Sequence, residues 1–126
     1  MILSLMFSLT STALAETFEE RVELARVAEK AEGSKSYQKQ MFDVIGPHMA
    51  TIMKSCFDAI KNPETEPFRL VADVTPEGRA DAVEVRPNTN IAACFSKGFA
   101  SVDFPPPPRF RGRPRFPVFI DMRIKP

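Results

Sequence analysis

The chain has little of the side-chain chemistry on which many enzymes and metal proteins depend. Among its 126 residues there is no tryptophan, one histidine, two cysteines and five glycines. The cysteines are too few for a zinc site built from cysteine pairs, and a serine- or cysteine-type triad has only His48 to use. The glycines are scattered singly, so no glycine-rich phosphate loop is present. The length fits about one domain, which excludes a large multi-step enzyme.

The chain does have apolar material and an uneven distribution of charge. Hydrophobic residues make up 44% of it, which is enough for a packed core. The net charge is only +1, but residues 104–126 carry six basic side chains against Asp121 alone. Residues 1–103 therefore hold the acidic excess, and the C-terminal end is a basic patch on a mildly acidic protein.

Residues 1–15 predict a cleaved signal peptide. They carry no charged side chain, and the apolar stretch from Ile2 to Leu9 leads to the small-x-small ending Ala13-Leu14-Ala15. The stretch is too short to span the hydrocarbon of a bilayer. We expect cleavage after Ala15 and export to the periplasm. An uncleaved anchor, a buried helix or a start further upstream are the alternatives.

Export sets the interpretation of Cys56 and Cys94. In an oxidising compartment, two cysteines at this separation predict one intramolecular disulfide. Such a bridge closes a loop of roughly 40 residues and stabilises the fold by about 3 to 4 kcal/mol in the chain-entropy model. The rival interpretation is a redox pair, which usually has a close spacing such as Cys-x-x-Cys.

The hydrophobic period divides the chain into a helical first half and a mixed second half. Spacings of three and four from Tyr37 to Ile60 predict a long helix, and alternation after Pro67 predicts strands. The expected elements are, in chain order, helices over 16–32 and 34–61, strands over 68–75 and 79–86, a helix over 91–100 and a strand over 116–124.

Local signals predict the caps, turns and breaks of these elements. Ser34 or Ser36 is expected to cap the second helix, and Gly46-Pro47 to kink or break it. Residues 75–78 predict a type I turn, and residues 88–90 supply caps for the third helix. The last strand alternates, with Phe119 as an apolar exception on its polar face.

The second half of the chain resembles a known family. A hairpin with a Glu77-Gly78 turn, a helix carrying Cys94 to Phe99, the phrase Phe104-Pro105-Pro106 and a final strand, Phe116 to Ile124, follow one another. This order resembles the C-terminal domain of the TonB/TolA superfamily. The resemblance implies an α+β fold over residues 63–126: a three-stranded antiparallel sheet with one packed helix, in the order ββαβ. The helical residues 16–62 are expected to join it in one compact domain.

The resemblance also implies a non-enzymatic function. Members of the family are periplasmic adaptors that engage partner proteins, often by offering an edge strand to a partner segment. We therefore expect a free-standing periplasmic relative that binds an envelope protein through the strand over 116–124. Whether the chain is a monomer is left open, and an edge-strand dimer is one alternative.

The basic segment before that strand is the best candidate for a binding loop, because alternating arginine and aromatic residues bind anions and stack on rings. The candidate contact residues are Arg109, Phe110, Arg111, Arg113, Arg115, Phe116 and Phe119. The alternative function is binding of envelope anions, lipopolysaccharide or phospholipid headgroups, through this loop. Nucleic acid is not an expected partner of an exported protein. The plainest interpretation is a solvated loop that keeps the neighbouring edge from aggregating.

No residue predicts catalysis, a metal site or a cofactor. His48 lies in an apolar helical pattern without a partner at a helical spacing. Met41, Met49 and Met53 recur at helical spacing, which favours core packing over a copper site.

Overall fold

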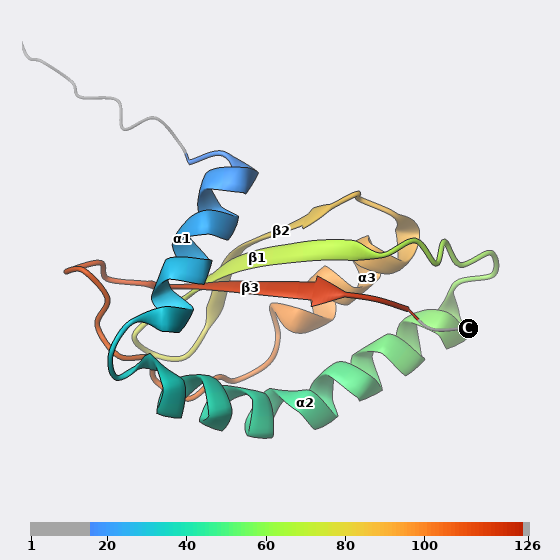
Figure 1. Ribbon diagram of the computed structural model, residues 1–126. Helices are drawn as coiled ribbons and strands as arrows, with labels where there is room; N and C mark the ends of the chain where they lie inside the picture. The colour runs from blue at the N-terminus through green and yellow to red at the C-terminus, as the bar shows by residue number, and fades with distance from the viewer. Residues whose placement is uncertain (1–15, 125–126) are drawn as a thin grey trace, which may run out of the picture.

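The computed structural model describes residues 16–124, so the expected signal peptide lies outside the described residues (Figure 1). Within them, three helices and three strands follow in the order α1 (Phe18–Lys30), α2 (Ser34–Ala59), β1 (Phe68–Val74), β2 (Ala80–Arg86), α3 (Asn90–Phe99) and β3 (Phe116–Met122). The strands form one antiparallel sheet. The α+β class expected from the sequence is therefore confirmed.

Strand β1 is the central strand of the sheet, whose order is β2-β1-β3. Its Leu70 and Val74 belong to the main core, together with residues of α2 and α3. On the opposite face of the sheet, Val71 packs against Phe18 and Val22 of α1. Figure 1 shows α1 crossing the sheet and α3 lying behind it. The sheet is therefore the middle layer of the molecule.

The layer formed by α1 explains the apolar exception in the last strand. Phe119 packs with Val71 and α1 instead of facing solvent. The guanidinium of Arg26 on α1 stands 5.5 Å from the centre of the Phe119 ring. The face that the sequence marks as polar is thus half covered by a helix.

Helix α1 begins at a capping box that the sequence analysis did not single out. The Glu20 N–H donates to the hydroxyl of Thr17, and the Thr17 N–H donates to the Glu20 carboxylate. Two of the otherwise unsatisfied donors of the first turn are paired in this way. The helix buries Phe18, Val22 and Ala25 and ends at Lys30.

One expectation for α2 is wrong, and of the kink or break expected at Gly46-Pro47 only the break is excluded. Its N-cap is Gly33, in the left-handed conformation with φ 84, and neither Ser34 nor Ser36 caps it. The break expected at Gly46-Pro47 is absent, because the helix continues through Pro47. Proline removes only its own N–H, and Pro47 is exposed, so water can satisfy the carbonyl left without a partner.

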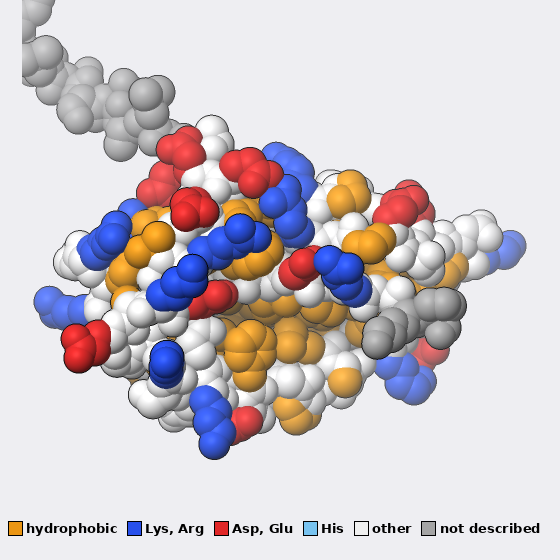
Figure 2. Space-filling model, in the orientation of Figure 1, with side chains coloured by type: hydrophobic (Ala, Val, Ile, Leu, Met, Phe, Trp, Pro, Cys, Tyr) orange, Lys and Arg blue, Asp and Glu red, His pale blue; other side chains and the backbone are white. Residues whose placement is uncertain are grey.

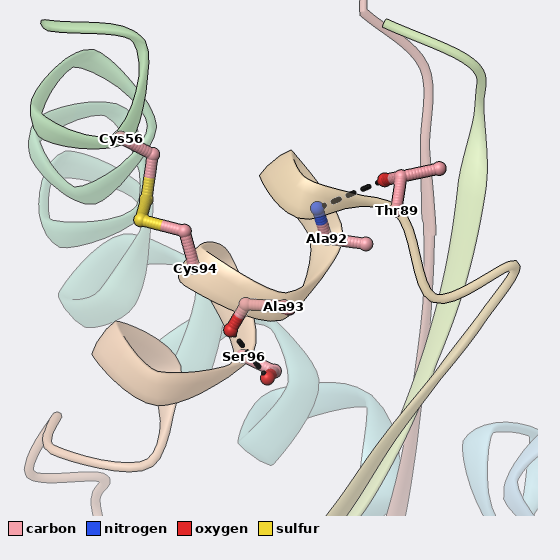
Figure 3. The surroundings of a disulfide bond; sticks show 6 residues. All are labelled: Cys56, Thr89, Ala92, Ala93, Cys94 and Ser96. Carbon is pink, nitrogen blue, oxygen red and sulfur yellow. Dashed lines mark hydrogen bonds between the residues drawn. A yellow bond between two sulfur atoms is a disulfide. The ribbon is translucent and has the colours of Figure 1, made fainter. Parts of the chain in front are cut away.

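The predicted disulfide is present. Cys56 of α2 and Cys94 of α3 are bonded across a sequence separation of 38 residues, with their Cα atoms 5.9 Å apart (Figure 3). The start of α3 is capped as expected, since the Ala92 N–H donates to the Thr89 hydroxyl at 3.1 Å. The bridge therefore joins the N-terminal helical half of the chain to the half that contains the sheet.

Candidate functional site

The basic loop, residues 109–115, contains two kinds of arginine. The first kind is paired with the protein's own carboxylates. Arg113 Nη1 lies 3.1 Å from Glu16 Oε1, and Arg115 Nη1 lies 2.6 Å from Asp81 Oδ2. Surface ion pairs of this type add little stability, but they engage both guanidinium groups. Arg113 and Arg115 are therefore attached to the fold rather than free for a ligand.

The second kind of arginine is open to solvent. Arg109 and Arg111 are exposed and form no ion pair with any residue from 16 to 124. Both line a cleft of about 540 Å³ together with Lys30, the last residue of α1. Figure 2 shows Lys and Arg side chains distributed over this face of the molecule, some of them at the end where α1 meets the loop. Lys30 was not among the expected binding residues, because nothing in the sequence links it to the loop.

Two of the expected contact residues are unavailable to a partner. Phe110 and Phe116 are buried in the main core. Their rings lie 6.2 Å apart, and Phe116 also meets the ring of Tyr37 at 5.2 Å. The aromatic residues that alternate with arginine anchor the loop from below, so they are corrected from binding residues to core residues. Phe119, the third aromatic candidate, is half-buried under α1.

The outer edge of β3 is paired with no strand of the described part of the chain. The direction of its backbone groups follows from the hairpin, where the Thr75 N–H donates to the Arg79 carbonyl at 2.8 Å. The N–H and C=O groups of successive residues point to opposite sides of a strand. Counting back from Thr75, every second residue of β1 therefore directs its backbone groups toward β2, and the residues between them direct theirs toward β3. The register of β3 then directs the backbone groups of Pro117, Phe119 and Asp121 outward.

Proline at the first of these positions agrees with this direction, since proline in sheets is confined to sites where no ladder donor is needed. Pro117 has no N–H. The outward donors within β3 are therefore the N–H groups of Phe119 and Asp121, and the carbonyls of all three residues are outward acceptors. The free edge of β3 thus offers the alternating donors and acceptors that an added strand requires.

The other edge of the sheet is less suited to pairing. The register of β2 on β1 shifts near Asp73, and Ala82 has a φ of 49. An irregularity of this kind twists a strand and interrupts its ladder, which blunts an edge. Strand β3 in contrast pairs with β1 through seven consecutive residues without a shift. The regular edge is therefore that of β3.

An apolar flank of α2 lies away from α3. His48 and Ile52 line a shallow cleft with Gly98 of α3, so this flank of α2 faces α3. At about 100° per residue, a different flank carries a second set of hydrophobic residues. Phe42 is exposed, and the others are half-buried and pack against the main core: Met49, Met53, Phe57 and Ile60. Figure 2 shows hydrophobic side chains along the strip between β3 and α2. We call these five residues the α2 apolar flank.

A part-buried ionic cluster connects α1 to the sheet. Arg21 on α1 lies 3.4 Å from Glu84 and 3.7 Å from Asp73. Burial raises the pKa of the Asp73 carboxyl, and the positive charge of Arg21 opposes this effect. Because each charge in the cluster faces one of opposite sign, we assign it to the packing of α1 rather than to a site.

The imidazole of the exposed His48 makes no hydrogen bond with any described residue. Residues 16–124 contain no group of three or more His, Cys, Asp or Glu side chains placed to hold a metal ion. Within the same range no helix is both long enough and apolar enough to cross a membrane. Comparison of the chain with protein-family models, with curated proteins and with solved structures gives no match.

Proposed function

We propose that the protein is a non-enzymatic adaptor that binds a partner protein by accepting an extended segment along the free edge of β3. The observation that carries the proposal is the regular, unpaired edge with its outward groups at Pro117, Phe119 and Asp121. Backbone hydrogen bonds to such an edge give affinity, and alternate side chains of the incoming segment give specificity.

The α2 apolar flank supports a choice of occupant. An extended segment that pairs with β3 points every second side chain to each face of the sheet. Side chains on the face of α2 and α3 would meet methionine and aromatic residues, which adapt to varied apolar partners. The proposed partner segment is therefore an extended stretch with apolar residues at every second position.

The resemblance to the TonB/TolA C-terminal domain is part of this proposal. In that family the edge strand after the proline-rich link engages partner segments, and β3 follows residues 105–108, which are four prolines. With the expected signal peptide, the proposed setting is the periplasm and the proposed partner is a protein of the cell envelope.

The experiment compares two substitutions at one position. Asp121→Pro removes an outward N–H and leaves the bonds between β3 and β1 in place, whereas Asp121→Ala keeps the N–H and removes only an exposed side chain. Immobilised wild type and both variants are exposed to envelope extract at low and high salt. We expect a discrete protein retained by wild type and Asp121→Ala at both salt levels, and about tenfold less of it on Asp121→Pro.

Salt separates strand addition from charge attraction, because backbone pairing survives ionic strengths that screen surface charges. Equal retention by the proline and alanine variants would contradict the proposal, as would retention only at low salt. Dimerisation of wild type that Asp121→Pro abolishes would replace the partner protein by a second copy of this chain. Circular dichroism of each variant checks that the sheet is intact.

A further inference from the structure

The cleft at the end of α1 has a strong excess of positive charge. Its charged lining residues are Lys30, Arg109 and Arg111 against the single carboxylate of Glu32. The remaining lining residues are apolar, and they are Val27, Ala31 and the largely buried Phe110. Lys30 belongs to α1 and both arginines belong to the basic loop, two segments distant in sequence that only the fold brings together. We call this the Lys30 cleft.

The backbone at Arg111 is in a conformation that arginine seldom adopts. Arg111 and Gly112 have φ values of 49 and 65, and the Arg113 N–H donates to the Phe110 carbonyl at 2.8 Å. Positive φ at both central residues defines a type I′ turn, where asparagine, aspartate or glycine is the usual first central residue. An arginine here is disfavoured by its Cβ. Such outliers occur where a side chain has a function that its conformation serves.

The position of the Arg111 side chain indicates what that function is. Its guanidinium lies 5.2 Å from the centre of the buried Phe110 ring, which orients it at the edge of the cleft. A stacked guanidinium keeps its N–H groups available for an oxyanion. The turn and the stacking together hold one of the three cations in place before any ligand arrives.

The start of α2 adds to the positive potential nearby. A second cleft shares Lys30 and Glu32 with the first and is also lined by Gly33, Lys35 and Ser36. No side chain caps this end of α2. The Ser34 N–H already donates to the Ala31 carbonyl at 3.1 Å. The N–H groups that follow it and the helix dipole favour negative charge on the same side of the molecule.

We propose that the Lys30 cleft binds the phosphate group of a phosphorylated ligand, with Arg111, Arg109 and Lys30 as its cationic partners. A planar guanidinium matches the oxygens of a phosphate, and an ammonium adds a point charge. This site is separate from the β3 edge and does not depend on the proposed strand addition. The phosphate belongs either to a soluble molecule or to a lipid headgroup, which the test distinguishes.

The test uses the full-length chain and two defined probes: inorganic pyrophosphate in calorimetry, and vesicles of phosphatidylglycerol with phosphatidylcholine in cosedimentation. Arg111→Asn removes the cation and places in the turn a residue that adopts positive φ more readily. We expect binding of at least one probe at low salt and roughly tenfold weaker binding in this variant. Its unfolding midpoint is expected to equal or exceed that of wild type.

Two further variants make the result decisive. Lys30→Gln lies on a different element and should weaken binding as well, whereas Arg115→Gln, whose guanidinium is paired with Asp81, should not. Binding of pyrophosphate identifies a soluble phosphorylated ligand, and binding of vesicles alone identifies a headgroup. Failure of wild type to bind either probe overturns the proposal, and so does undiminished binding by both Arg111→Asn and Lys30→Gln.

Discussion

At the scale of single residues, Tyr37 has a hydroxyl whose pKa is strongly shifted by the fold. Its hydroxyl donates to the Pro105 carbonyl at 3.0 Å, and its ring packs against Phe116. The side chain is buried, which raises the pKa of the Tyr37 hydroxyl to about 12. Ionisation would leave a buried negative charge with no cation beside it and would reverse the role of the hydroxyl as donor.

This raised pKa predicts a loss of stability in alkali. The folded state holds the hydroxyl proton more tightly than the unfolded state, so the stability is fully present below pH 10 and falls as the pH rises from 10 to 12. At about 1.4 kcal/mol per pKa unit, the loss is about 3 kcal/mol. Tyr37 is the only tyrosine, so phenolate absorbance reports it alone. A folded-state midpoint near 10, or the same alkaline loss in Tyr37→Phe, would refute the prediction.

The sequence predicted the basic loop but not the roles of its residues. Alternation of arginine and phenylalanine looks the same whether an arginine is free or paired. Arg115 is paired because the fold brings Asp81 beside it, and Phe110 is buried because the turn at Arg111 folds over the core. Both facts depend on contacts between distant segments, which a local pattern does not contain.

At the scale of elements, two helical glycines form a matched pair for testing the contact between α2 and α3. A Cβ added at Gly98 would lie 2.5 Å from Ile52 Cγ2, whereas one added at Gly46 has nothing within 4 Å apart from the two adjoining residues and the backbone of its own helix. Isoleucine is stiff at its branched Cβ, so the crowded methyl group cannot easily move aside.

We expect Gly46→Ala to change the free energy of unfolding by less than about 1 kcal/mol, because the helix preference of alanine is opposed by the contact of its Cβ with the ring of Pro47. Gly98→Ala is expected to destabilise the protein by about 1 to 3 kcal/mol through overpacking. Denaturant unfolding of both variants measures the difference. Stabilisation by Gly98→Ala would mean that the two helices are less closely packed than the structure has them.

The positions of the elements were the most predictable feature of the molecule. Strong periodicity gave every helix and strand to within a few residues, because local propensity and burial agree there. The helix is not broken at Pro47, which was one of the two outcomes expected there, because tertiary packing on both sides of it outweighs one lost hydrogen bond. The free edge of β3 was expected only through a family resemblance. The core packing expected for Met49 and Met53 is confirmed, although both stay half-exposed on the α2 apolar flank.

At the scale of the whole molecule, the sheet is packed between helices on both of its faces. Helix α1 covers one face, and α2 and α3 cover the other. Residues 16–62 therefore have no core of their own, since their buried side chains contact the sheet. The Cys56–Cys94 disulfide fixes this arrangement covalently.

This packing predicts that residues 16–124 unfold as one cooperative unit. Denaturant unfolding followed by far-ultraviolet circular dichroism and by Tyr37 fluorescence should give coincident transitions, since the first reports the whole backbone and the second reports the contact of α2 with β3.

Reduction of the disulfide opens the loop that it closes between two cysteines 38 residues apart in sequence. The expected loss is about 3 to 4 kcal/mol in the chain-entropy model, and the two transitions should remain coincident. The double variant Cys56→Ser with Cys94→Ser controls for effects of the reductant. Separation of the two transitions in the oxidised protein would mean that the N-terminal helices and the sheet unfold as two units. The contact between α2 and β3 would then be too weak to couple them.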